Sequence, residues 1–404
     1  MSITLAFILV ASLLLPGSAL AAHFGDLVNG MILLDVESRG EAWYVYPETQ
    51  ERYYLGRPVD AFEMMRELSL GITDENLSKI PVAGSDEQGD LDLRERLAGT
   101  ILLQVESRGE AWYVYPKTLE RHYLGRPEDA FALMTELGLG ITSTNLAHIP
   151  IATESLEPPL NEDSSYRELT MVTDEGSFVV HLITLRRDRF DMMTDTAEPE
   201  DCDKDCDALS LSEYVSRHDA FAAIHGSYFC PPDYEACSNV INTFLPPVYK
   251  TAEEQMIQED SLNYFQRPFI VQSDDESLFY FHRAPDFGKS VLEFEETYHQ
   301  TMQAGIGNWP SLVEEGESVV HSEPSESSFL VNGTRGGIGW NDEVIYLAVA
   351  KNATVPNLAA IFVAIGADYA LNLDGGGSAA LYYDGAYQVG PGRDLPNAIL
   401  FKKR

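Results

Sequence analysis

The pattern of hydrophobic and polar positions changes near residue 166. Before that point, short apolar and aromatic runs come before amphipathic stretches, and the arrangement occurs twice. After it, apolar runs alternate with turn residues, which is typical of strands. We expect strands and one helix (355–365) in this second part; the strands are predicted at 177–185, 220–224, 269–272, 278–282, 344–349, 369–373 and 379–383.

The first part contains an internal duplication. Residues 30–81 align without gaps with residues 99–150. Each copy begins with strand-like runs, 32–36 and 43–46 in the first copy, and Ser38-Arg39-Gly40 between them predicts a hairpin turn. A segment of this size is near the lower limit for a core of its own. The two copies are therefore expected to pack on each other or on the rest of the chain.

A helix is predicted after the strand-like runs of each copy. In the first copy it starts near Pro58 and ends at Gly71, with Phe62, Met65 and Leu68 along its apolar face. Each copy is thus predicted to be a ββα module.

Aromatic residues are concentrated in both copies. They are Trp43, Tyr44, Tyr53 and Tyr54 in the first copy and Trp112, Tyr113 and Tyr123 in the second. Because a strand turns every second side chain inward, alternate members are expected to fill the core. The alternative is an exposed platform that stacks on sugar rings.

The N-terminus predicts export. An apolar run at 5–15 is followed by small residues at 18–22 that suit signal peptidase. A basic start is missing, which leaves an uncleaved membrane anchor open as the alternative. No later run approaches the ~20 apolar residues that span a bilayer. We expect a secreted or extracytoplasmic protein associated with the cell envelope, with a membrane contact at most through this segment.

The fold class predicted is α+β, with a C-terminal mixed-sheet domain preceded by two small ββα repeat modules. The predicted divisions are a signal peptide (1–22), a first module (23–83), a linker (84–98), a second module (99–152), a second linker (153–165) and a C-terminal domain (166–404). Both linkers are polar and are expected to be solvated.

Charge excludes one class of partner. Asp and Glu number 64 against 27 for Lys and Arg, so the formal net charge is -37. Such a chain repels polyanions, and nucleic-acid binding is not expected. The oligomeric state is not indicated by the sequence.

The four cysteines lie in one short stretch of a chain predicted to be exported. Disulfides are therefore expected among Cys202, Cys206, Cys230 and Cys237, with local pairing of the first two and of the last two as one of three connectivities. A metal site built from cysteines is the alternative, but the spacings lack the C-x2-C pattern of zinc sites.

The most informative stretch is 370–380, where an apolar strand runs into Asp374 and three glycines, Gly375, Gly376 and Gly377. Glycines permit a sharp turn and close approach of a ligand to the backbone. The turn would expose Asp374, Ser378 and several N–H groups that suit an anion. A P-loop is excluded because no Lys-Ser or Lys-Thr follows, and the G-x-S-x-G pattern is only half matched. A purely structural turn remains the alternative.

Five segments together carry a resemblance to a known family. They are Ala223-Ile224-His225-Gly226-Ser227-Tyr228-Phe229, Pro310-Ser311-Leu312-Val313-Glu314-Glu315-Gly316, Arg335-Gly336-Gly337-Ile338-Gly339, Asn372 to Ser378, and Gly392-Arg393-Asp394-Leu395-Pro396-Asn397-Ala398. In this order the chain resembles the phosphodiester glycosidase family over roughly residues 220–401. Two positions depart from the family's pattern: His225 replaces Asn, and Gly336 replaces Thr. The insertion from Cys230 to about Arg267 is expected to form a flap pinned by a disulfide.

The resemblance implies hydrolysis between the anomeric carbon of a sugar and the phosphate of a phosphodiester. The implied catalytic residues are Asp374 as stabiliser, nucleophile or base, Arg335 on the phosphate, His225 as proton carrier or hydrogen-bond donor, and Ser378. The implied substrate-binding residues are Asn372, Gly375, Gly376, Gly377, Arg393, Tyr228 and Asn397.

The expected partner is a phosphorylated sugar or a cell-envelope polysaccharide. No cofactor is required by this chemistry, and a divalent cation held by Asp374 and other carboxylates is left open. Two alternatives compete with the hydrolase: a noncatalytic cell-surface protein that binds polysaccharide with the same fold, and a phosphodiesterase that cuts P–O rather than C–O bonds.

Overall fold

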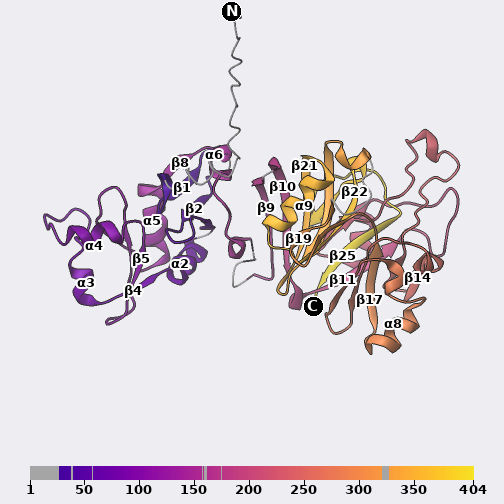
Figure 1. The fold of residues 1–404 in the computed structure, drawn as a ribbon, viewed down its shortest axis with the longest axis horizontal. Helices are drawn as coiled ribbons and strands as arrows, with labels where there is room; N and C mark the ends of the chain where they lie inside the picture. Colours follow the sequence, from indigo (N-terminus) through magenta and orange to yellow (C-terminus); the bar gives the residue numbers. More distant parts are fainter. Residues whose placement is uncertain are drawn as a thin grey trace, which may run out of the picture. The chain divides into compact units, whose positions relative to one another are not determined.

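The computed structural model describes residues 27–37, 40–56, 58–156, 158, 162–173, 175–320 and 327–404. The predicted signal peptide, the Ser38-Arg39 part of the predicted turn and a part of the second predicted linker lie outside them. The chain divides into two compact units, Met1–Pro150 and Ile151–Arg404, which are described separately (Figure 1). Among the described residues, no helix has the length and apolar character needed to cross a membrane.

The N-terminal unit contains the same succession of elements twice. The first copy has β1 (Ile32–Asp35), β2 (Ala42–Val45), β3 (Arg52–Tyr54), α2 (Pro58–Glu67), β4 (Leu70–Ile72) and α3 (Asp74–Ser78). The second has β5 (Ile101–Gln104), β6 (Ala111–Val114), β7 (Arg121–Tyr123), α5 (Pro127–Leu137), β8 (Leu139–Ile141) and α6 (Ser143–Ala147). Each copy therefore has more strands than the predicted ββα module. The helix of the first copy ends at Glu67 rather than at Gly71, because Gly71 lies in β4 and pairs with another strand.

The two copies exchange one strand each. β8 pairs in parallel with β1, and β4 pairs in parallel with β5, which gives the sheet orders β3-β2-β1-β8 and β4-β5-β6-β7. The hydroxyl of Tyr44 donates to the carbonyl of Gly99 at 2.7 Å, and Tyr113 donates to Gly30 at the same distance. Each sheet thus takes three strands from one copy and its fourth from the other, so the copies form one unit.

Most of the aromatic residues of the repeats fill the core. Trp43, Tyr44, Tyr53 and Tyr113 are buried, whereas Tyr123 is 46% exposed. The core interpretation is therefore favoured over an aromatic platform for sugars.

The first predicted linker is partly folded. It contains the helix α4 (Leu91–Arg96), whose first turn is capped by the Asp90 side chain. Leu93 and Leu97 are buried in an apolar cluster with Leu102 and Val114. Only the polar part before Asp90 fits a solvated spacer.

The C-terminal unit is built mainly from three sheets. The largest has the order β19-β18-β22-β20-β21-β10-β9. Its strands are β9 (Ser164–Thr173), β10 (Gly176–Arg186), β18 (Ser311–Glu314), β19 (Glu317–Ser318), β20 (Gly333–Trp340), β21 (Val344–Ala353) and β22 (Tyr369–Gly375). The second has the order β11-β25-β12-β23-β24. Its strands are β11 (Phe190–Thr196), β12 (Ala222–His225), β23 (Leu381–Tyr383), β24 (Ala386–Val389) and β25 (Asn397–Lys403).

The third sheet has the order β14-β13-β17-β15-β16. Its strands are β13 (Val248–Lys250), β14 (Gln255–Ile257), β15 (Phe269–Ser273), β16 (Leu278–Phe281) and β17 (Met302–Gly307), and the longer helices of this unit are α7 (Leu211–His218), α8 (Val291–Tyr298) and α9 (Val355–Ala364). The strand pairs described in this unit are antiparallel. The mixed sheets predicted here occur instead in the N-terminal unit, where strand exchange produces the parallel pairs.

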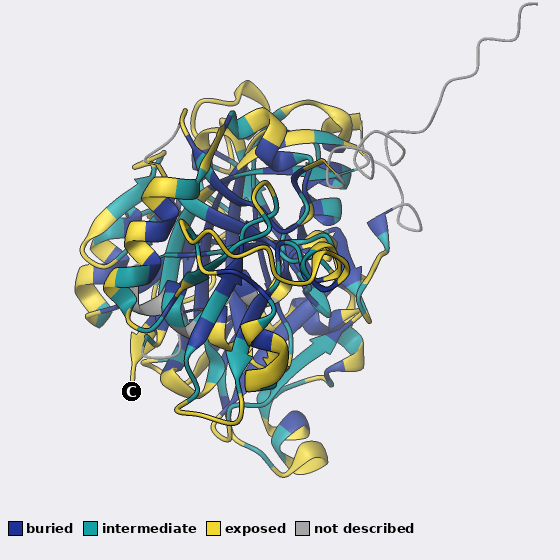
Figure 2. Ribbon diagram, turned by 90° about the vertical axis from the view of Figure 1, so that its left-hand side faces the viewer, coloured by how far each residue is buried: buried dark blue, intermediate teal, exposed yellow. Residues whose placement is uncertain are grey.

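The core of the C-terminal unit contains buried residues from all three sheets. Figure 2 marks the buried residues in dark blue. Alternate residues of β21, Ile345, Leu347 and Val349, point into this core, and the residues between them are buried as well. Strand β21 is therefore covered on both faces. On the face away from this core, Gly337 and Gly339 of β20 let the ring of Phe362 from α9 approach the sheet closely.

Candidate functional site

The predicted glycine turn lies at the end of β22, a strand paired on both sides within the largest sheet. The strand is buried from Ala370 to Leu373 and ends at Gly375, where a short 3-10 turn over Gly376–Ser378 begins. Gly376 has a φ of +58°, a left-handed conformation that favours glycine. The chain can therefore leave the sheet abruptly just after Asp374.

Asp374 is held by both main-chain and side-chain contacts. Its carboxylate accepts a hydrogen bond from the N–H of Gly375 at 2.8 Å, and its own N–H donates to Gly226 at 3.0 Å. Burial raises the pKa of the carboxyl group, while Ser378, the Gly375 N–H and the charge of Arg393 act in the opposite direction. A carboxyl group with a raised pKa at a turn is typical of a functional position.

His225, at the end of β12, is fully buried behind the turn. Its Nε2 lies 2.6 Å from the carbonyl oxygen of Asp374, and its Nδ1 lies 3.0 Å from the carbonyl oxygen and 3.2 Å from the main-chain nitrogen of Ala380. Burial lowers the pKa of the imidazole and outweighs the two carbonyl contacts and the Asp374 charge, which raise it. Both nitrogens are thus engaged by the main chain, which favours a positioning role over that of a proton carrier.

The two departures from the family's pattern lie against each other. A side chain added at Gly336, on β20, would collide with the imidazole ring of His225. The larger residue at position 225 therefore needs glycine at position 336. The two positions are therefore coupled, since the side chain at position 225 limits the size of the residue at position 336.

Arg335 lies beside the turn, because it pairs with Gly375 across β20 and β22. A methyl group added to Gly375 would lie 3.7 Å from Nη1 of Arg335. Its Nη2 donates to the carbonyls of Ser328 and Val331 at 2.8 and 2.6 Å. These bonds fix the guanidinium next to the turn.

Arg393 reaches the same turn from the segment before β25. Its main-chain N–H donates to Gly377 at 2.9 Å, and a methyl group added to Gly377 would lie 2.5 Å from Nη2 of Arg393. Nη2 also donates to the carboxylate of Asp233 at 3.0 Å. Arg335 and Arg393 thus lie next to two glycines of one turn, although they come from distant parts of the chain.

Asn372 and Ser378 are fully buried on either side of Asp374. The amide nitrogen of Asn372 donates to the hydroxyl of Tyr228 at 2.8 Å. Oδ1 of Asn372 and Oγ of Ser378 have no hydrogen-bond partner, although the Ser378 hydroxyl lies close enough to Asp374 to lower its pKa. Buried polar atoms normally have partners, so these two are candidates for contact with a bound molecule or water.

The remaining predicted residue, Asn397, is buried below the site. Its Oδ1 accepts from the N–H of Ser227 at 2.8 Å, and its Nδ2 donates to the Ser227 hydroxyl at 3.0 Å. Gly226 is held so closely against Asn397 that it has no room for a side chain. Asn397 supports the segment that follows β12 and has no contact with Asp374 among its recorded bonds.

Sequence reasoning missed three residues near the turn. Asn308 connects Tyr228 and Asn372, because its Oδ1 accepts from the N–H of Tyr228 at 3.0 Å and its Nδ2 donates to the Asn372 carbonyl at 2.7 Å. Asn308 could have been found from the sequence, because it lies just before the family-like segment that starts at Pro310. Asp233 and Tyr234 lie beside Arg393 in the long insertion and carried no family signal.

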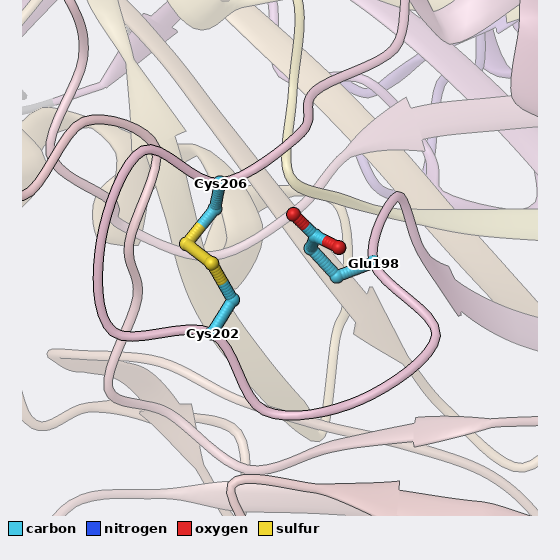
Figure 3. Close-up of side chains that lie close together, drawn as sticks. All are labelled: Glu198, Cys202 and Cys206. Atoms are coloured by element: carbon cyan, nitrogen blue, oxygen red, sulfur yellow. A yellow bond between two sulfur atoms is a disulfide. The ribbon is translucent and has the colours of Figure 1, made fainter.

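Two disulfides join Cys202 to Cys206 and Cys230 to Cys237, which is the local pairing expected. Glu198 lies beside the first of them (Figure 3). Since the sulfurs of Cys202 and Cys206 are bonded to each other, they offer no thiolate to a metal ion. Disulfides are typical of proteins outside the cytoplasm.

A surface cavity of about 430 Å³ lies elsewhere. It is lined by Arg186, Arg187, Asp188, Asp275, Glu276, Ser277, Asp342 and Glu343. Arg186 pairs with Val344, whereas Arg335 pairs with Ala350 near the other end of β21. The cavity is therefore separate from the glycine turn.

Comparison with known proteins finds a family match within the C-terminal unit. Residues 222–402 match the phosphodiester glycosidase family, so this part of the chain is a phosphodiester glycosidase family domain. No curated protein matches the sequence.

The solved structures that are similar to the chain include the two described here. A hypothetical protein from Synechocystis has 14% identity and a TM-score of 0.41, with 60% of this chain and 62% of that protein covered. The catalytic domain of zebrafish N-acetylglucosamine-1-phosphodiester alpha-N-acetylglucosaminidase, auto-inhibited by its pro-peptide, has 14% identity and a TM-score of 0.47, with 61% of this chain and 86% of that domain covered. The chain thus spans less than two thirds of the Synechocystis protein.

Proposed function

We propose that the protein is an exported hydrolase that cleaves sugar 1-phosphodiesters, with cell-envelope or extracellular polysaccharide as its substrate. The observation that carries the proposal is the meeting of Asp374, Arg335 and Arg393 at one glycine turn. The family domain supports the reaction class, and the two disulfides support export.

The chemistry of the substrate fits the residues at the turn. The leaving group is a phosphate monoester whose second pKa is near 6, so it departs without a strong general acid. Arg335 and Arg393 would stabilise the phosphate charge with their planar guanidinium groups. Asp374 would face the sugar, where positive charge grows as the C–O bond breaks.

In the proposed overall reaction, the bond from the anomeric carbon to the phosphate oxygen breaks and its electron pair leaves with the phosphate. A water oxygen ends on the anomeric carbon and gives up its proton. Whether Asp374 acts as nucleophile, base or stabiliser determines the order of these events, and each role uses the ionised carboxylate. If a divalent cation binds here, the carboxylate of Asp374 and the amide oxygen of Asn372 are the kinds of oxygen ligand that it would use.

The test is hydrolysis of the methyl diester of N-acetylglucosamine 1-phosphate. We expect release of N-acetylglucosamine, and complete loss of release in Asp374→Ala and Arg335→Ala with nearly unchanged melting temperatures. Arg283→Ala is the control, since Arg283 forms only an exposed ion pair with Asp286 among its recorded bonds. Loss of folding together with activity would instead mark the two residues as structural.

Two other outcomes distinguish the alternatives. Saturable binding of the diester without products would favour the noncatalytic polysaccharide-binding protein. Reaction in water enriched in heavy oxygen would place the label in the sugar for C–O cleavage and in the phosphate for P–O cleavage.

A further inference from the structure

The loop closed by the Cys230–Cys237 disulfide lies next to Arg393. It follows β12 by a few residues, after Tyr228, whose hydroxyl is bonded to Asn372. The base of the loop is fixed by two main-chain bonds, from Cys230 to Thr243 at 2.9 Å and from Asn242 to Cys230 at 2.7 Å. A disulfide and these bonds hold the loop at the edge of the candidate site.

The carboxylate of Asp233, in this loop, occupies one edge of the Arg393 guanidinium. The Asp233 side chain is 57% exposed and that of Arg393 is 22% exposed. An ion pair of this exposure contributes at most about 1 kcal/mol, so an incoming phosphate can replace it. The displaced carboxylate would remain close to the bound anion, because the loop is anchored at both ends.

Tyr234, the next residue, presents its ring to solvent beside the same guanidinium. The residue is 57% exposed, and its ring centroid lies 5.6 Å from Cζ of Arg393. An aromatic ring held by a short disulfide loop loses little conformational freedom when it binds a ligand. Its exposed surface is suited to the apolar face of a sugar ring attached to the phosphate.

We propose that Asp233 and Tyr234 form a specificity subsite that favours a singly charged phosphodiester bearing a sugar over the doubly charged monoester. This rests on the proposed function and adds the selection of substrate over product. Tyr234 contacts the sugar in both ligands. Asp233 repels the second negative charge that a phosphate monoester carries above its second pKa of about 6.

The experiment measures binding by calorimetry at pH 7.5. All variants carry Asp374→Asn, so that the diester is not hydrolysed during the measurement. The ligands are N-acetylglucosamine 1-phosphate, its methyl diester and inorganic phosphate. Adding Asp233→Asn should tighten the monoester about tenfold and the diester only about threefold, since the repulsion is proportional to the charge of the ligand. Adding Tyr234→Ala should weaken both sugar ligands about threefold to tenfold and leave inorganic phosphate unchanged.

Matched controls are Asp286→Asn and Tyr264→Ala in the same background. Asp286 forms an exposed ion pair with Arg283, and Tyr264 is 59% exposed, much as Tyr234 is. Neither control should change the affinity of any of the ligands. Equal effects of Asp233→Asn on monoester and diester would overturn the proposal, as would unchanged sugar binding in Tyr234→Ala or failure of the background protein to bind either sugar ligand.

The outcomes separate this subsite from the proposed function. If Asp233→Asn discriminates between the ligands but the wild type releases no sugar, the subsite stands and hydrolysis fails. If the wild type hydrolyses the diester but the two substitutions have no selective effect, hydrolysis stands and the subsite fails.

Discussion

At the scale of single residues, the contrast between Asp374 and His225 defines the site. Both are close to the glycine turn, but the histidine is enclosed by main-chain groups, whereas the carboxylate faces the N–H of Gly375, the hydroxyl of Ser378 and the charge of Arg393. Burial raises the pKa of this carboxyl group in spite of these neighbours, so keeping it ionised costs stability. Such a residue is better explained by function than by folding.

The raised pKa of Asp374 predicts the pH dependence of activity. The ionised form is lost as pH falls through the raised pKa, so kcat/KM should decline on the acid side at a pH above about 3.9, the value for an unperturbed aspartate. A pH profile of diester hydrolysis measures this. An acid limb at or below 3.9 would contradict the assignment of Asp374 to catalysis.

The pair of His225 and Gly336 predicts coupled effects on stability. Gly336→Ala forces its methyl group against the imidazole and should lower the free energy of unfolding by about 1 to 3 kcal/mol. In the His225→Asn background the same substitution should cost less, because the shorter side chain leaves room.

Urea unfolding of the two single variants and the double variant measures this coupling. Gly333→Ala is the control, since it lies on the same strand and a methyl group there meets nothing within 4 Å. Additive losses in the double variant would argue against the coupling.

At the scale of elements, Asp195 connects a strand of one sheet to a helix and to a second sheet. Its carboxylate, on β11, receives bonds from Arg217 at 2.9 Å and His218 at 2.7 Å at the end of α7, and lies 3.5 Å from the ammonium of Lys250 on β13. The side chains of Asp195 and Lys250 are 2% and 4% exposed. A buried carboxylate with these partners holds the three elements together.

This cluster predicts an acid-sensitive contribution to stability. Burial raises the pKa of Asp195, but the bond from His218 and the charges of Lys250 and Arg217 outweigh it, so the pKa lies below its usual value. The contribution is therefore fully present above the unfolded pKa of about 3.9 and is lost as pH falls through the lower folded pKa.

Asp195→Asn should lower the free energy of unfolding at pH 7 by about 3 kcal/mol, because it leaves the buried Lys250 with only the half-exposed carboxylate of Glu253 as an ionic partner. Its stability should also fall less between pH 5 and pH 3 than that of the wild type. Urea unfolding across this range measures both effects, with Asp286→Asn as the exposed control. A variant that loses stability with acid as steeply as the wild type would contradict the role of Asp195.

Many elements of the C-terminal unit were predictable because their strands are continuous apolar runs. The prediction at 344–349 lies within β21, and that at 355–365 overlaps α9. Strand β20 was missed because its glycines are typical of turns, whereas here they admit Phe362 and His225. The glycine turn was found from composition, but the contact of Asp233 with Arg393 joins segments far apart in sequence and has no local pattern.

At the scale of the whole molecule, the sequence predicted the duplication but not the exchange of strands between the copies. The segments that become β4 and β8 have the same sequence, Leu-Gly-Ile, as a consequence of the repeat. Strand β1 would therefore meet the same three residues whether it paired with β4 of its own copy or, as observed, with β8 of the other copy. Only the path of the chain distinguishes the two arrangements, and no residue pattern encodes that path.

The exchange also determines what holds the N-terminal unit together. Because each copy completes the sheet of the other, the peptide bonds between the copies are not what keeps them associated. A single proteolytic cut between Gly84 and Gly89, in the exposed segment ahead of α4, should leave two fragments that elute together under native conditions and separate only in denaturant. The unit would then behave as a heterodimer encoded in one polypeptide.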